Sequence, residues 1–169
     1  MRVARSKHVT VVYNPVKVDL GRLRRALERS VSPGARVTWS ATSAEDPGYA
    51  QASRALEDGA DLIVAAGGDG TVRMVALAVS GSHVPMAIVP AGTGNMLARN
   101  LGIPLALEPA VRRALSGRER VIDLCPKQHV FRISEIALSE QNHLICLQTE
   151  RKRAKEFIII SLIHQNGLS

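Results

Sequence analysis

The chain has 169 residues, which is enough for one α/β domain with a hydrophobic core and too few for two domains of ordinary size. Hydrophobic residues make up 46% and aromatic residues 3%, so the composition excludes a disordered chain and predicts an aliphatic core. The net charge of +7 suits an anionic partner but does not choose among a nucleotide, an anionic lipid surface and nucleic acid.

The sequence shows no signal for export or for a membrane span. The two cysteines are in no metal-ligand spacing, and no apolar run approaches the roughly 20 residues that cross a bilayer. The basic first residues lead into too short an apolar stretch for a signal peptide. We therefore expect a cytoplasmic protein, either free or peripheral at the membrane.

Short apolar strands alternate with amphipathic helices up to residue 124. Strands are expected at 8–13, 35–42, 61–66, 85–89 and 120–124, and helices from Asp19, from Asp46, and over 71–80, 95–101 and 105–115. Neighbouring parallel strands need a crossover connection, which is usually a helix. This order predicts an α/β fold with a Rossmann-like, doubly wound parallel sheet and flanking helices.

The pattern changes after Leu124. We expect one domain over residues 1–124 and an atypical tail over 125–169, in which 157–163 is strongly β-prone. The basic cluster Arg151-Lys152-Arg153 in this tail could bind nucleic acid, but no aromatic stacking pattern accompanies it. Nucleic acid is therefore not the favoured partner.

A glycine-rich segment, Gly67-Gly68-Asp69-Gly70-Thr71, stands between an apolar strand and a helix. Glycines allow close approach of the backbone to a phosphate, and the free amides of a helix N-terminus attract an anion. Thr71 can cap the helix and donate to a phosphate oxygen. This first glycine loop is a candidate phosphate site.

Asp69 is the unusual member of the first glycine loop. Its charge would repel a phosphate unless it holds a divalent cation or serves the hydroxyl of an acceptor, which favours phosphoryl transfer over passive binding. The alternative is a tight turn in which Asp69 caps the helix.

A second glycine loop, Gly92-Thr93-Gly94-Asn95, follows the next strand. Two loops at adjacent strand ends can converge on one ligand; the alternative is a turn capped by Asn95. Arg99, nearby, either reaches a phosphate or forms a structural salt bridge.

The ordered motifs Asn14-Pro15, Thr42, the first glycine loop and Pro90-Ala91-Gly92-Thr93-Gly94-Asn95 resemble the catalytic domain of diacylglycerol kinases. That family belongs to the superfamily of diacylglycerol, sphingosine and NAD kinases, and the resemblance covers about residues 8–124. The stretch 95–104 resembles the lipid kinases more than the NAD kinases.

The resemblance implies a Rossmann-like nucleotide-binding domain, ATP and Mg²⁺ as cofactors, and a lipid hydroxyl, such as that of diacylglycerol at a membrane surface, as acceptor. Asp69 is the expected catalytic residue, and no metal ligand is assigned. The family contacts to ATP fall on Asn14, Thr42, Gly67, Gly68, Asp69, Gly70, Thr71, Val72, Arg73 and Thr93, to which the second loop adds Gly92, Gly94 and Asn95.

Members of the family continue into a β-sandwich domain that supplies further magnesium ligands and a catalytic acid, and nothing in 126–169 matches it. We therefore expect an ATP-dependent lipid kinase in a truncated form with reduced or no activity. The alternatives are an ATP-binding module without turnover and, less favoured, an NAD kinase or a basic nucleic-acid-binding protein. The lipid acceptor and a possible homodimer stay open.

Overall fold

The computed structural model describes residues 8–116, 118–125, 130–132 and 157–162. Its centre is a parallel sheet of four strands, β1 (His8–Tyr13), β2 (Arg36–Ala41), β3 (Leu62–Gly67) and β4 (Met86–Pro90), in the order β2-β1-β3-β4. The sheet continues as β7-β5-β6 beyond β4, with β5 (Arg118–Cys125), β6 (Val130–Arg132) and β7 (Phe157–Leu162). The predicted α/β class and parallel sheet are confirmed.

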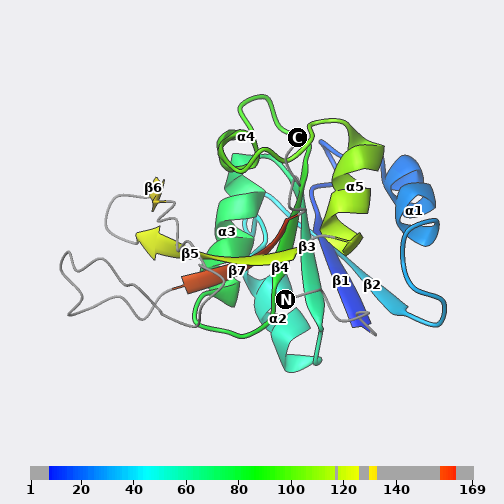
Figure 1. Ribbon diagram of the computed structural model, residues 1–169, viewed down its shortest axis with the longest axis horizontal. Coiled ribbons are helices and arrows are strands. Elements are labelled where there is room, and N and C mark those ends of the chain that lie inside the picture. The colour runs from blue at the N-terminus through cyan, green and yellow to red at the C-terminus, as the bar shows by residue number, and fades with distance from the viewer. Residues whose placement is uncertain (1–7, 117, 126–129, 133–156, 163–169) are drawn as a thin grey trace, which may run out of the picture.

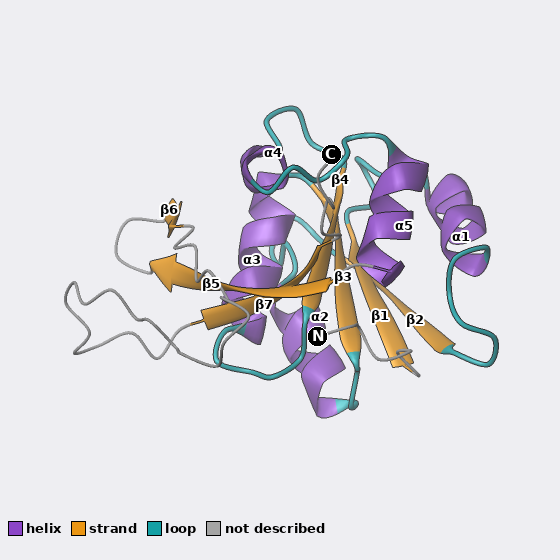
Figure 2. Cartoon of the chain, in the orientation of Figure 1, coloured by secondary structure: helices purple, strands orange, loops and turns teal. Residues whose placement is uncertain are grey.

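Helices cover both faces of the parallel sheet (Figures 1 and 2). The helices are α1 (Leu20–Glu28), α2 (Tyr49–Glu57), α3 (Asp69–Val79), α4 (Met96–Asn100) and α5 (Leu107–Ser116). On one face α1 packs against α5, and on the other α2 packs against α3. The chain is therefore doubly wound, as the alternation of strands and helices predicted.

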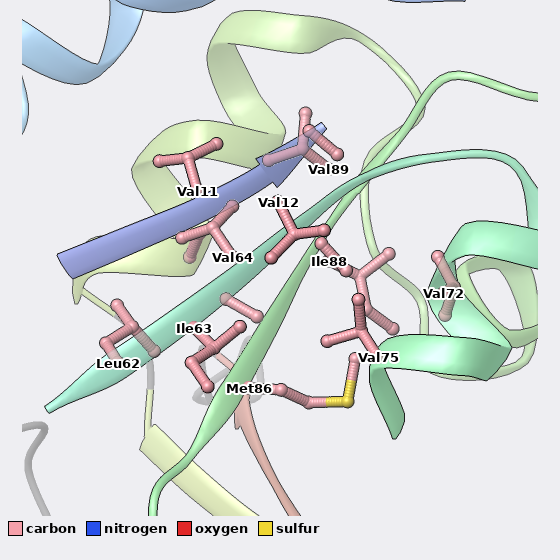
Figure 3. Packing of buried hydrophobic residues seen from close by; sticks show 14 of the residues in the cluster. Val11, Val12, Leu62, Ile63, Val64, Val72, Val75, Met86, Ile88 and Val89 are labelled. Carbon is pink, nitrogen blue, oxygen red and sulfur yellow. The ribbon is translucent and has the colours of Figure 1, made fainter. Parts of the chain in front are cut away.

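The core is aliphatic and lies between the central strands and the helices on both faces; Figure 3 shows the part that includes α3. Val12, Ala65 and Ile88 are in register across β1, β3 and β4, so their side chains line the same face. Ile88 of β4 and Val75 of α3 both belong to this buried cluster (Figure 3). All six residues of β3 are buried, as expected of a central parallel strand covered on both faces.

The helices begin one to three residues away from the predicted positions, and α2 and α3 show why. We expected a helix from Asp46, but α2 begins at Tyr49, and the Asp46 carboxylate accepts hydrogen bonds from the amides of Gly48, Tyr49 and Ala50. Likewise α3 begins at Asp69 rather than Thr71, with Gly68 as its N-cap. In α3 the turn residues Asp69 and Gly70 form the first turn of the helix, whereas Asp46 stays outside α2 and bonds to its first amides.

The β-prone stretch near the end of the chain forms β7. This strand pairs in parallel with β4 through Met86 and Ile160 and antiparallel with β5, so it covers the edge of β4. The division of the chain at residue 124 stays a prediction. The basic cluster at 151–153 lies outside the described residues.

Candidate functional site

Three loops leave the sheet side by side at the carboxyl ends of β1, β3 and β4. The amide of Asn14 donates to the carbonyl of Ala66 (2.9 Å), and the amide of Ala91 donates to the carbonyl of Gly67 (2.8 Å). These bonds extend the ladder just past the strands. The strand order reverses between β1 and β3, and ligands of open parallel sheets bind outside such a switch point.

The first glycine loop leads directly into α3. A Cβ atom at Gly67 would lie 2.8 Å from both Cβ and Oγ1 of Thr71, so only glycine fits there. Gly68 is the N-cap, no side chain caps this end, and the first helical hydrogen bond runs from the Val72 amide to the Gly68 carbonyl (3.0 Å). The preceding amides of residues 69–71 are left for a ligand or solvent.

This arrangement corrects one expectation about Thr71. It does not cap α3, because it is the third helical residue and its side chain is buried beneath Gly67. The side chain of Val72 is also buried in the core, and its amide is bonded to Gly68. The exposed residues of this turn are Asp69 and Gly70.

The two glycine loops touch through their backbones. A Cβ atom at Gly92 would lie 2.7 Å from Cα of Gly68, and one at Gly68 would lie 3.3 Å from Cα of Gly92. The predicted convergence of the two loops is therefore present in the structure. Together they form one surface at the N-terminal end of α3.

Asn95 shapes the second glycine loop from within. It has a left-handed backbone (φ 49°), its Oδ1 accepts from the amide of Gly92 (2.8 Å), and its Nδ2 donates to the carbonyl of Gly92 (2.6 Å). It precedes α4 but forms no side-chain cap there. Nε of Arg99 donates to the carbonyl of Gly94 (2.8 Å) and so holds the loop from the side of α4. Thr93 and Gly94 are exposed.

Asp69 links the two loops. Its Oδ1 accepts a hydrogen bond from the amide of Met96, the first residue of α4, at 2.7 Å. Its Oδ2 would lie 2.8 Å from a Cβ atom at Gly94. Asp69 therefore does not act as the N-cap of its own helix; it holds the start of the next one.

The loop after β1 contributes a group that the sequence analysis missed. Oδ1 of Asn14 accepts from the amides of Val16 (2.9 Å) and Lys17 (3.2 Å), which fixes the turn. The ammonium of Lys17 then lies over Gly68, 2.9 Å from the position of a Cβ atom there. The available signal was a lysine three residues after Asn14 in a strand-end loop.

The remaining predicted positions lie farther from this junction. Thr42 is buried at the end of β2, where its amide donates to the carbonyl of Tyr13 (2.9 Å). Arg73 lies in the second turn of α3 and is partly exposed. The structure thus brings Gly67, Gly68, Asp69, Gly92, Gly94 and Asn95 into contact, with Asn14 joined to them through Lys17.

The carboxylate of Asp69 is an oxygen donor of the kind that Mg²⁺ takes, and Mg²⁺ is commonly held by one or two carboxylates together with substrate phosphates. In the described part of the chain, no group of three or more His, Cys, Asp or Glu side chains is placed to hold a metal ion. Asp69 is therefore the carboxylate that the described residues of this junction offer to such an ion. No helix in these same residues is long and apolar enough to cross a membrane.

The family model for the diacylglycerol kinase catalytic domain matches residues 8–126, more than half of the chain. A "Probable lipid kinase YegS-like" protein of Citrobacter koseri is 36% identical over 114 residues, which cover 65% of this chain and 36% of that protein. A "Probable lipid kinase YegS" of Escherichia fergusonii is 33% identical over 122 residues, covering 68% and 40%. The chain thus spans well under half the length of these relatives.

Solved structures agree on the fold. A diacylglycerol kinase structure from Bacillus anthracis strain Sterne superposes with a TM-score of 0.57 at 22% identity, covering 71% of this chain and 47% of that one. A second structure from the same strain gives a TM-score of 0.57 with 42% of its chain covered. The similarity thus extends over the N-terminal part of those structures. The chain belongs to the diacylglycerol kinase catalytic domain family.

Proposed function

We propose that the chain binds ATP with its phosphates on the two glycine loops, and that it serves the transfer of the γ-phosphoryl group to a lipid hydroxyl. The observation that carries this proposal is the contact of Gly68 with Gly92 at the uncapped N-terminus of α3. Backbone amides and the positive end of a helix suit a phosphate, and the exposed backbone of both loops is open to one.

The proposed contacts follow the loops. The amides of Asp69, Gly70 and Thr71 meet one phosphate, and Thr93 and Gly94 of the second loop meet a neighbouring one. Magnesium, bound with the nucleotide, would neutralise charge on the phosphate oxygens. Asn14, Thr42, Val72 and Arg73 stay predicted nucleotide contacts, which the family membership supports.

The acceptor hydroxyl would attack the γ-phosphorus in line with the leaving oxygen. A bond forms between the acceptor oxygen and phosphorus, the bond to the β-phosphate oxygen breaks, and ADP leaves. We assign the hydroxyl proton to the carboxylate of Asp69, through Oδ2, because Oδ1 is occupied by the amide of Met96. This gives Asp69 a catalytic role beside its structural one.

A lipid acceptor, of which diacylglycerol is the candidate, is supported by the family and by the names of the two relatives. An acceptor in a bilayer would place the protein at the cytoplasmic membrane surface, where its net charge of +7 suits anionic lipid. The second candidate is an ATP-binding module without turnover.

Two measurements on the purified chain separate these candidates. Calorimetric titration with Mg-ATP reports binding, and transfer of label from γ-labelled ATP to diacylglycerol in mixed micelles reports turnover. Saturable binding with labelled phosphatidic acid supports the lipid kinase, and binding without labelled lipid supports the module. No binding by a folded chain would refute both.

A further inference from the structure

Lys17 is held in place by the turn after β1. The carbonyl of Asn14 accepts from the amides of Lys17 (3.2 Å) and Val18 (3.0 Å), in addition to the two amides bound by its side chain. The amide of Asn14 is in turn bonded to β3 through Ala66. The backbone of Lys17 is therefore fixed relative to the strand that leads into the first glycine loop.

The side chain of Lys17 lies across that loop. From the position of a Cβ atom at Gly68, Nζ of Lys17 is 2.9 Å away, Cδ is 3.7 Å away, and Cα of Gly92 is 3.3 Å away. The ammonium thus lies where the loops after β1, β3 and β4 meet. It lies over Gly68, the glycine that touches Gly92 of the second loop.

No carboxylate of the protein neutralises this ammonium within the described residues. The salt bridge found there joins Arg22 and Glu108. Asp69, the carboxylate of the neighbouring loop, directs Oδ1 to the amide of Met96 and carries Oδ2 beside Gly94. Lys17 is also exposed, so nothing in this part of the structure buries its charge.

The ammonium lies next to the N-terminal end of α3, which has no side-chain cap. That end carries a partial positive charge, and a cation beside it is unfavourable. The arrangement becomes favourable once an anion binds between the helix amides and the ammonium. Asp69, the acidic residue of this first turn, directs its carboxylate to the Met96 amide and toward Gly94, so the ammonium and the amides at the start of α3 are left for a phosphate.

Resting on the proposed function, we propose that Lys17 is a phosphate-binding residue of this nucleotide site, and that its ammonium contacts the phosphate that the amides at the start of α3 bind. Lysine suits this role because its ammonium is a compact charge on a flexible stem and binds phosphate as a point charge. The assignment adds a third loop to the phosphate site.

The test is calorimetric titration of the full chain with Mg-ATP for wild type, K17M, K17R and the control R54M. Methionine keeps most of the stem of Lys17 and removes the charge. Arg54 is exposed in the last turn of α2, at the other end of the sheet, so R54M makes the same change in net charge away from the site.

We expect K17M to weaken ATP binding by about tenfold or more, which a lost charge-assisted hydrogen bond produces. K17R should bind more tightly than K17M, and R54M should bind as wild type does.

Two further readouts exclude a structural role for Lys17. The affinity of K17M for Mg-ATP should depend less steeply on salt, and its thermal midpoint without nucleotide should be no lower than that of wild type, because a charge unfavourable to the helix end has gone. A lowered midpoint with unchanged affinity for ATP would overturn the assignment.

The outcomes separate the two proposals. If wild type binds and K17M binds equally well, Lys17 has no phosphate role while the nucleotide site stands. If the folded wild-type chain does not bind Mg-ATP, the proposed function fails and the role of Lys17 fails with it.

Discussion

Replacing Gly92 with alanine should separate the two glycine loops. The new Cβ would lie 2.7 Å from Cα of Gly68 and 3.1 Å from Oδ1 of Asn95. Carbon atoms in favourable contact are about 3.5–4.0 Å apart, so the loops must move by about 1 Å. The φ angle of Gly92 is not positive, so alanine is not strained by the backbone conformation there. The loss of stability therefore comes from the clash.

The magnitude follows from overpacking, which typically costs about 1–3 kcal/mol. The shift also strains the 2.8 Å hydrogen bond from the Gly92 amide to Asn95, so we expect a loss of about 2 kcal/mol in the free energy of unfolding. In a chain of this size, that corresponds to a thermal midpoint lower by about 4–8 °C. Thermal and urea unfolding followed by circular dichroism measure both quantities.

Gly70 provides the matched control. It lies in the first turn of α3 with no neighbouring atom within 4 Å of a Cβ position, and its φ is not positive. Alanine is favoured over glycine in a helix by about 0.5–1 kcal/mol, so G70A should be as stable as wild type or slightly more stable. A G92A variant that unfolds at the same urea concentration as wild type, beside a well-behaved G70A, would refute the contact between the loops.

Two other predictions concern Asp69 and Glu108. D69A should be less stable than D69N by about 1 kcal/mol, because only asparagine keeps an acceptor for the Met96 amide, while both variants lose phosphoryl transfer; equal urea midpoints would contradict the bond. The pKa of Glu108 is lowered first by its own backbone amide and then by Arg22, so R22Q should raise this pKa only part of the way to its ordinary value in an NMR titration. A carboxyl group whose pKa is lowered by folding stabilises the fold at pH values above its unfolded pKa, and this stabilisation is lost as the pH falls through the folded pKa. R22Q brings the folded pKa of Glu108 closer to the unfolded one, so it should narrow the acidic pH range over which stability is lost. A complete return of the pKa to its ordinary value would show that the backbone is not the leading cause.

The sequence predicted the architecture because its signals are local. The β-branched run at 8–13 is followed by Asn14-Pro15, and β1 spans residues 8–13 as predicted. The apolar run before the first glycine loop forms β3, which is fully buried. The late β-prone stretch was also recognisable as a strand. Its partners, β4 and β5, were not predicted, because pairing between distant segments depends on the three-dimensional arrangement.

The geometry around the glycine loops was predicted only in part. The convergence of the loops followed from adjacent strand ends, whereas the bond from Asp69 to Met96 joins residues 27 apart and has no sequence signal. Capping by Asn95 was a reasonable local expectation, but its side chain bonds to Gly92 instead. Lys17 was missed because a single lysine in a basic chain carries no signal until the fold places it over Gly68.

These contacts concern the binding of the nucleotide, which can be measured separately from transfer to the acceptor. The bonds that shape the proposed phosphate site join three loops within residues 14–99, all at one end of the parallel sheet. Nucleotide affinity should therefore depend on these loops, whereas turnover also needs an acceptor held in line with the leaving oxygen. A substitution in the loops should change the affinity for ATP and the transfer rate together. A change in how the lipid is held should lower the transfer rate and leave the affinity for ATP unchanged, so comparing the two quantities locates the groups that hold the acceptor.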